Sequence, residues 1–192
     1  MSKLELQQIP DRKALLLIDF QRDFLTESGR MPVARHQIAP VIAAANEAVV
    51  AANMSAAEVV AIGNEFSPAD RLMNLVRRGA AIAGSSGARW DDRVPIAGAT
   101  YFPKWRSDAF CNSDLSGFLR ERGIGEVILA GLFAHACVTA TAKAALARGL
   151  KVSIVRDAVA DASDRAREAA LNHLARRGVG VNAGYPIDKR HG

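Results

Sequence analysis

The sequence predicts an α/β fold, a three-layer α/β/α sandwich around a central, mostly parallel sheet of the Rossmann-like type. Short β-branched or aliphatic runs alternate along the chain with longer stretches rich in alanine and arginine. The run at residues 15–18 is apolar throughout, which is typical of a strand that helices cover on both faces. The chain has 192 residues. At roughly 150 residues per domain, we expect one domain over residues 1–192.

The apolar runs define the expected strands in order. They lie at residues 14–18, 58–62, 100–102, 126–130, 151–155 and 179–182, and the third is the shortest. Helical patterns fall between them, at residues 38–53, 68–77, 113–122, 138–148 and 164–177. The last pattern is the most periodic, because Ala166, Ala170 and Leu174 fall on one stripe. Gly149 and Gly178 stand where two of these helices should end. Residues 84–99, rich in Gly, Ser and Pro, are expected to form a surface loop.

The composition excludes several classes of protein. Hydrophobic residues make up 49% and charged residues 23% of the chain, as in ordinary globular domains and unlike disordered, collagen-like or small disulfide-rich chains. No apolar run approaches the roughly 18 residues of a membrane helix, and the first residues do not resemble a signal peptide. We therefore expect a cytoplasmic protein without a membrane partner. Two cysteines, Cys111 and Cys137, are too few for a disulfide framework.

The charge pattern argues against nucleic acid as a partner. The chain has 25 basic and 20 acidic residues, a net charge of +5, and only 6% aromatic residues. The basic residues are scattered and are not interleaved with aromatic ones on one face, as nucleic-acid binding would need. The Gly-rich residues 84–87 contain neither a GKS/T sequence nor a GxGxxG arrangement. A phosphate or dinucleotide cradle is therefore not expected there.

Reactive side chains follow three of the predicted strands, and in an open parallel sheet ligands bind beyond the carboxyl ends of the strands. Asp19 ends a very apolar strand, so it is either a turn aspartate or a general base with raised proton affinity. Cys137 begins a helix after the strand at 126–130, where the helix dipole lowers a thiol pKa. Otherwise Cys137 is a small buried hydrophobe. Lys104 follows the short strand and would stabilise a neighbouring thiolate.

Four stretches in this order resemble the isochorismatase-like cysteine hydrolase family, which includes nicotinamidases, carbamoylsarcosine amidases and ureidoacrylate amidohydrolases. They are the strand with its aspartate at 15–24, the Gly-rich loop at 84–88, the lysine segment at 104–124 and the nucleophile turn at 131–137, followed by 155–158. The resemblance spans about residues 14–182.

The resemblance implies specific roles. Cys137 would be the nucleophile, Asp19 the base that takes its proton, and Lys104 the cation that holds the pair in place. The family also has a non-proline cis peptide, which would fall here at Leu132-Phe133 and would aim the backbone N–H groups of Phe133 and Cys137 at an oxyanion. The implied reaction is attack on an amide carbonyl, loss of ammonia or an amine, and hydrolysis of the thioester.

The resemblance is incomplete at the place where nicotinamidases bind a metal. Those relatives carry an aspartate and two histidines after the second strand. Residues 62–70 contain no histidine, and none occurs between His36 and His135. We therefore expect no metal site and no cofactor.

The substrate is expected to be a small molecule, bound by residues that flank the three reactive positions, although core packing explains most of these residues equally well. The expected contacts are Phe24, Asn64, Phe66, Trp105 and His135. Residues 133–135 also resemble the turn of true isochorismatases, which keeps vinyl-ether hydrolysis as an alternative reaction. A third possibility is a non-catalytic binding protein on the same fold. Because relatives commonly form dimers or tetramers, a homo-oligomer is expected.

Overall fold

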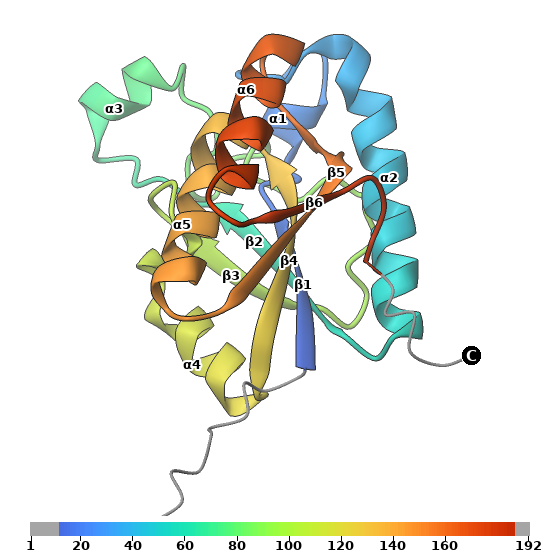
Figure 1. Cartoon of the computed structure of the whole chain (residues 1–192). Coiled ribbons are helices and arrows are strands. Elements are labelled where there is room, and N and C mark those ends of the chain that lie inside the picture. Colours follow the sequence, from blue (N-terminus) through green and yellow to red (C-terminus); the bar gives the residue numbers. More distant parts are fainter. Residues whose placement is uncertain (1–11, 187–192) are drawn as a thin grey trace, which may run out of the picture.

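A computed structural model describes residues 12–186 and contains a six-stranded sheet between layers of helices (Figure 1). The strands lie in the order β3-β2-β1-β4-β5-β6, and every neighbouring pair is parallel. This is the strand order of the Rossmann fold, so the predicted fold class is confirmed. The strands are β1 (Arg12–Ile18), β2 (Glu58–Asn64), β3 (Thr100–Lys104), β4 (Ile124–Leu132), β5 (Lys151–Ala160) and β6 (Gly180–Asn182).

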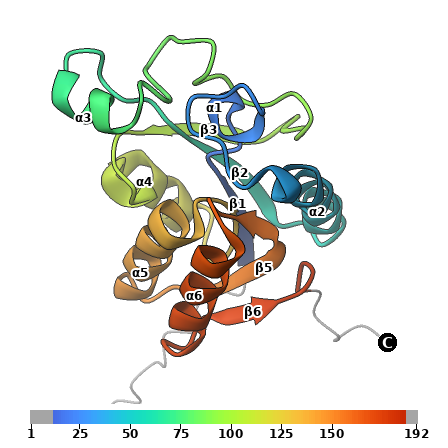
Figure 2. The ribbon, with the colours of Figure 1, turned by 90° about the horizontal axis from the view of Figure 1, so that it is seen from above.

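Helices cover both faces of the sheet (Figure 2). The helical elements are α1 (Arg22–Leu25), α2 (Arg35–Met54), α3 (Arg71–Val76), α4 (Ser113–Glu121), α5 (Thr139–Ala147) and α6 (Asp164–Ala175), with a 3-10 turn η1 (Ala109–Cys111) and a π-helical turn η2 (Ala134–Val138).

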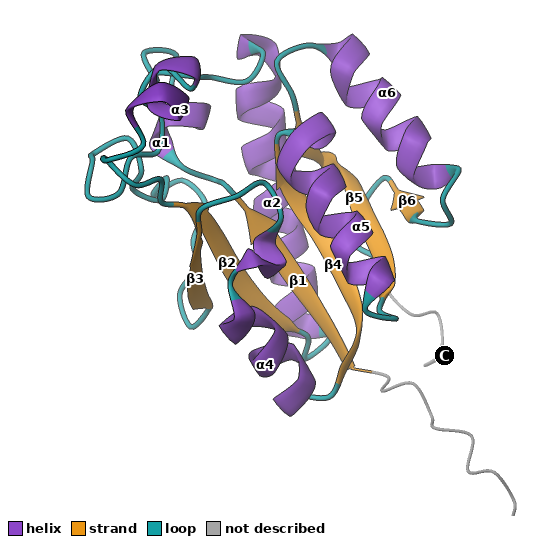
Figure 3. Ribbon diagram, turned by 90° about the vertical axis from the view of Figure 1, so that its left-hand side faces the viewer, coloured by secondary structure: helices purple, strands orange, loops and turns teal. Residues whose placement is uncertain are grey.

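The sheet separates two apolar cores, one on each face. Leu15 and Leu17 of β1 pack with α1 and α2. Leu16 and Ile18 pack with α4, α5 and α6, which lie in front of the sheet in Figure 3. This double burial is what the apolar run in β1 predicts. Within the described residues, no helix is long and apolar enough to cross a membrane.

The boundaries of several elements differ from the prediction. Residues 68–77 form only the short helix α3, which is capped by the carboxylate of Asp70. Helix α2 starts earlier than expected, and α1 was not predicted. Strand β5 runs on to Ala160 because its pairing with β4 changes register between Leu129 and Gly131, and then resumes. A π-helical turn replaces the expected helix start at residue 138.

Gly131 lets β1 and β4 approach each other closely near their carboxyl ends. The strand order of the sheet reverses between these two strands. The φ angle of Gly131 is 156°, and a Cβ atom there would lie 2.5 Å from the carbonyl oxygen of Ile18. Only glycine permits this approach. The carboxyl ends of β1 and β4 consequently lie side by side, at the place where open α/β sheets bind ligands.

Candidate active site

Asp19 is the first residue after β1, where the chain turns out of the sheet. Its φ angle is 62°, a left-handed conformation that aspartate tolerates better than most residues. Its backbone N–H donates to the carbonyl of Ile62 at the end of β2. The carboxylate is buried and does not cap helix α1.

Lys104 is the last residue of β3, and its ammonium group lies at the centre of the cluster. The nitrogen Nζ is 2.9 Å from Oδ2 of Asp19 and 3.3 Å from Sγ of Cys137. It also donates to Oδ1 of Asn64 at 2.7 Å and to the carbonyl of Arg106 at 3.2 Å. The side chain of Lys104 is fully buried and that of Asp19 is 1% exposed, so neither charge is screened by water.

Cys137 is held in η2, the π-helical turn between β4 and α5. The peptide bond between Leu132 and Phe133 at the entrance to this turn is cis, as the resemblance implies. The N–H groups of Ala136 and Val138 both donate to the carbonyl of Phe133. The turn thereby places the thiol against Lys104 and Asp19, and the three predicted residues lie together.

Burial and the attraction between opposite charges shift the pKa values of Asp19 and Lys104. Burial raises the pKa of Asp19, and the attraction of Lys104 only partly offsets this effect. Burial alone would lower the pKa of Lys104, but Asp19 and Cys137 outweigh it and raise that pKa. The carboxylate of Asp19 contacts the ammonium of Lys104, and it also faces the thiol of Cys137 and the backbone of Asn64. A proton acceptor therefore lies beside the sulfur of Cys137.

The thiol of Cys137 does not have the lowered pKa that its place in the sequence predicts. Burial and the nearby Asp19 carboxylate raise its pKa to about 12, and Lys104 only partly opposes them. The expectation was wrong because it considered the helix terminus and not the buried anion beside the sulfur. At neutral pH the proton consequently rests on sulfur, and Asp19 is the group placed to remove it.

The expected substrate contacts do not all lie beside Asp19, Lys104 and Cys137. Asn64 lies inside the cluster, bonded to Lys104, with its amide nitrogen 3.9 Å from Sγ of Cys137. The rings of Phe24 and Phe133 pack edge to face with centroids 5.6 Å apart in the core under α2.

The two remaining aromatic contacts lie in different surroundings. Phe66 is buried beneath the guanidinium group of Arg77, which lies 3.8 Å from its ring centre. Trp105 is 49% exposed, although it directly follows the buried Lys104. Their contact with a substrate stays a prediction.

His135 is fixed by an aspartate that the sequence reasoning missed. Asp161, fully buried after β5, accepts from the backbone N–H of His135 at 2.9 Å and lies 2.8 Å from its Nδ1. The imidazole is 60% exposed. His135 is therefore a hydrogen-bonded residue of the turn, and its ring is largely open to solvent. An acid that ends an apolar strand was the signal available for Asp161, the same signal that identified Asp19.

The end of β2 does not offer a metal site. Within residues 12–186, no group of three histidine, cysteine, aspartate or glutamate side chains is arranged to hold a metal ion. The one carboxylate directly after Asn64 belongs to Glu65, and it accepts a hydrogen bond from the hydroxyl of Tyr101 at 3.0 Å. These donors do not fit the aspartate and two histidines of a metal-binding relative.

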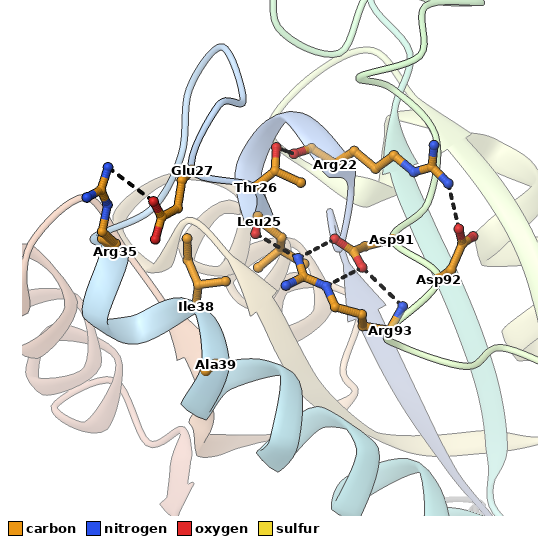
Figure 4. Close-up of a pocket in the computed structure, with 10 residues that line it drawn as sticks. All are labelled: Arg22, Leu25, Thr26, Glu27, Arg35, Ile38, Ala39, Asp91, Asp92 and Arg93. Carbon is orange, nitrogen blue, oxygen red and sulfur yellow. Dashed lines mark hydrogen bonds and ion pairs between the residues drawn. The ribbon is translucent and has the colours of Figure 1, made fainter.

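A separate pocket of about 660 Å³ lies between α1, the start of α2 and residues 91–93 (Figure 4). Its three arginines each pair with an acid: Arg22 with Asp92, Arg35 with Glu27, and Arg93 with Asp91. None of Asp19, Lys104 and Cys137 lines it. The pocket is therefore distinct from the cluster, and each of its arginines is already paired with an acidic side chain.

Comparison with known sequences identifies the relatives of this chain. The model of the isochorismatase domain family matches residues 13–183. Enterobactin synthase component B of Escherichia coli strain K12 is 31% identical over 170 residues, which cover 88% of this chain and 59% of that relative. The chain thus spans less than two thirds of the length of that relative.

Known structures show the same fold. The N-carbamoylsarcosine amidase from Thermoplasma acidophilum superposes with a TM-score of 0.79 at 27% identity, over 92% of this chain and 99% of that one. The nicotinamidase PncA from Bacillus subtilis superposes with a TM-score of 0.81 at 27% identity, over 88% and 98% of the two chains.

Proposed function

Because the chain belongs to the isochorismatase family, we propose that it is a metal-independent cysteine hydrolase that cleaves a C–N bond of a small carboxamide or ureido compound. The observation that carries the proposal is the ammonium of Lys104 in contact with both the Asp19 carboxylate and the Cys137 thiol. The structural likeness to two amidases supports the amide as the substrate class.

The first half of the proposed reaction forms a thioester. The Asp19 carboxylate takes the thiol proton, and Sγ of Cys137 attacks the carbonyl carbon. The backbone N–H groups of Phe133 and Cys137 stabilise the oxygen that becomes negative. The C–N bond then breaks, and the protonated Asp19 gives its proton to the departing ammonia or amine.

The second half releases the acid and restores the enzyme. Asp19, again a carboxylate, removes a proton from water as the water oxygen attacks the thioester carbonyl. The C–S bond breaks, and the proton returns to sulfur. In each half one proton passes onto Asp19 and then off again, so the cluster with Lys104 has the same net charge whether oxygen or sulfur carries the proton. This constant charge suits a site that excludes water.

A second candidate reaction is vinyl-ether hydrolysis. The raised pKa of Asp19 favours it, because a buried carboxyl that holds its proton can act as a general acid. The resemblance of residues 133–135 to the turn of true isochorismatases points the same way. In this reaction Cys137 would not form a covalent bond, so substitution of the thiol separates the two candidates.

The direct test is ammonia release from a panel of small carboxamides and ureido compounds. We expect release by the parent protein and none by Cys137→Ala. Cys111→Ala is the matched control, because Cys111 is the other cysteine of the chain, and we expect it to retain activity. Equal activity of Cys137→Ala would overturn the cysteine mechanism. A folded parent protein that releases nothing would instead favour vinyl-ether hydrolysis or a non-catalytic binding protein.

Two further expectations belong to this proposal. We expect the enzyme to act in the cytoplasm and to form a dimer or tetramer. Exposed apolar side chains on α3, among them Leu72, Leu75 and Val76, offer surface for contact between copies. Light scattering of the eluted protein measures the oligomeric state, and a monomer at micromolar concentration would contradict the second expectation.

A further inference from the structure

Gln21 is a fully buried glutamine that no step of the proposed reaction uses. Its side-chain carboxamide contacts both backbone groups of Asn64. The amide nitrogen donates to the Asn64 carbonyl at 2.8 Å, and the amide oxygen accepts from the Asn64 N–H at 2.9 Å. The same nitrogen also donates to the carbonyl of Ala88, at 2.6 Å. One side chain thus joins the turn after β1, the end of β2 and the Gly-rich loop.

The residue held by this clamp reaches the reactive cluster. Asn64 accepts a hydrogen bond from the ammonium of Lys104, and its amide nitrogen points toward Sγ of Cys137. Only Cβ separates the clamped backbone of Asn64 from its side-chain amide group. A small rotation of that backbone would therefore move the side-chain amide away from Lys104 and Cys137.

The neighbouring glycine leaves space for the clamp. A Cβ atom at Gly63 would lie 3.2 Å from the amide nitrogen of Gln21, and it would collide with the hydroxyl of Tyr101. Gly63 has no positive φ angle that would otherwise require glycine. The absence of a side chain at this position therefore serves the close approach of Gln21 and Tyr101 to β2.

We propose that Gln21 is a positioning residue that fixes the backbone of Asn64, and through Asn64 the orientation of Lys104 relative to Cys137. The inference rests on the proposed function, because it assigns Gln21 a role in the readiness of the Cys137 thiol to react. Gln21 itself touches neither the thiol nor the ammonium. Its effect passes through the three hydrogen bonds of its carboxamide.

A thiol alkylation assay tests this inference without knowledge of the substrate. All variants carry Cys111→Ala, so that Cys137 is the only cysteine, and its alkylation by iodoacetamide is followed by mass across the pH range. We expect Gln21→Met to lower the alkylation rate at neutral pH by about ten- to a hundredfold, since small displacements of reacting groups have effects of that size. On a hydrolysed amide, kcat should fall in the same proportion with little change in KM.

A double-mutant cycle distinguishes positioning from a general loss of structure. If Gln21 acts through Asn64, then Gln21→Met should change the rate little once Asn64→Ala is present. The matched control is Asn46→Leu, because Asn46 on α2 also carries a side-chain amide that donates to a backbone carbonyl, that of Arg93. Asn46→Leu should leave the alkylation profile of Cys137 unchanged. If Gln21→Met does not fold, Gly63→Ala crowds the same carboxamide and should show the same dependence on Asn64.

The outcomes separate this inference from the proposed function. Either of two results would overturn the positioning role alone. In the first, Gln21→Met leaves the alkylation rate of Cys137 unchanged. In the second, Gln21→Met lowers this rate equally with and without Asn64→Ala. Equal hydrolysis of an amide by the parent protein and by Cys137→Ala would instead overturn the proposed function.

Discussion

The ammonium nitrogen of Lys104 lies 2.9 Å from Oδ2 of Asp19, and the two side chains are almost completely shielded from solvent. A buried ion pair of this kind adds little net stability over an apolar pair, yet removing one partner leaves a charge without compensation. Lys104 also contacts the Cys137 thiol. The pair is therefore best explained by the chemistry it supports and not by the stability of the fold.

Replacement of Lys104 by methionine should reduce both stability and activity. The change leaves the Asp19 carboxylate buried without its cation, so we expect a loss of about 3–5 kcal/mol in the free energy of unfolding at neutral pH, measured in urea. The double variant Lys104→Met with Asp19→Asn should recover part of this loss. Lys143→Met, at an exposed position on α5, is the control. Strictly additive losses in the double variant would show that the two groups do not interact.

The pH dependence of amide hydrolysis should reflect Asp19. Burial raises its pKa above the usual value of about 3.8, and the reaction needs the carboxylate form. We therefore expect kcat/KM to fall as the pH is lowered through this raised pKa, and the fall should be absent from any residual activity of Asp19→Asn. On the alkaline side the raised pKa of Lys104 keeps its cation. Activity that instead falls as the pH rises through the pKa of Asp19 would indicate a general acid, as in vinyl-ether hydrolysis.

Asp161 should stabilise the turn that holds Cys137. Its carboxylate accepts from the backbone of His135 and Ala162, and Asp161→Ala leaves these donors unpaired. We expect a loss of about 1–3 kcal/mol in thermal or urea unfolding, together with slower alkylation of Cys137. Asp164→Ala breaks the comparable but exposed contact with His36 and should have a smaller effect. Equal effects of the two substitutions would show that burial of Asp161 is unimportant.

Chelation should leave the proposed hydrolase activity unchanged. The side chains at the end of β2 do not form a metal site in the described part of the chain. Dialysis against EDTA, followed by an assay with and without added Zn²⁺, checks this expectation. A loss of activity that Zn²⁺ restores would show that a metal takes part.

The layers and the parallel sheet of the fold followed from simple patterns in the sequence. Alternating apolar and helical stretches predicted the layers, and the apolar run of β1 predicted burial on both faces. The ends of elements were harder to place, because they depend on contacts between strands. The register shift between β4 and β5 lets β5 continue to Ala160, and no local pattern in residues 151–160 shows it.

The candidate site was predictable to the extent that its residues are unusual for their place in the chain. Their places after predicted strands singled out Asp19, Cys137 and Lys104, and the resemblance gave the three residues their proposed roles. The raised thiol pKa was missed because it depends on the distance between residues far apart in sequence. Gln21 was missed for a related reason, since the function of a buried glutamine is defined by its partners and those lie at residues 64 and 88.

The most direct test of the nucleophile is mass spectrometry of the protein quenched with acid during turnover of the best amide from the panel. The account predicts an added acyl group on the peptide that contains Cys137, and none on the peptide that contains Cys111. The adduct should disappear when substrate is exhausted and should not form on Asp19→Asn. An acyl group on another residue, or turnover that continues unchanged in Cys137→Ala, would contradict the account.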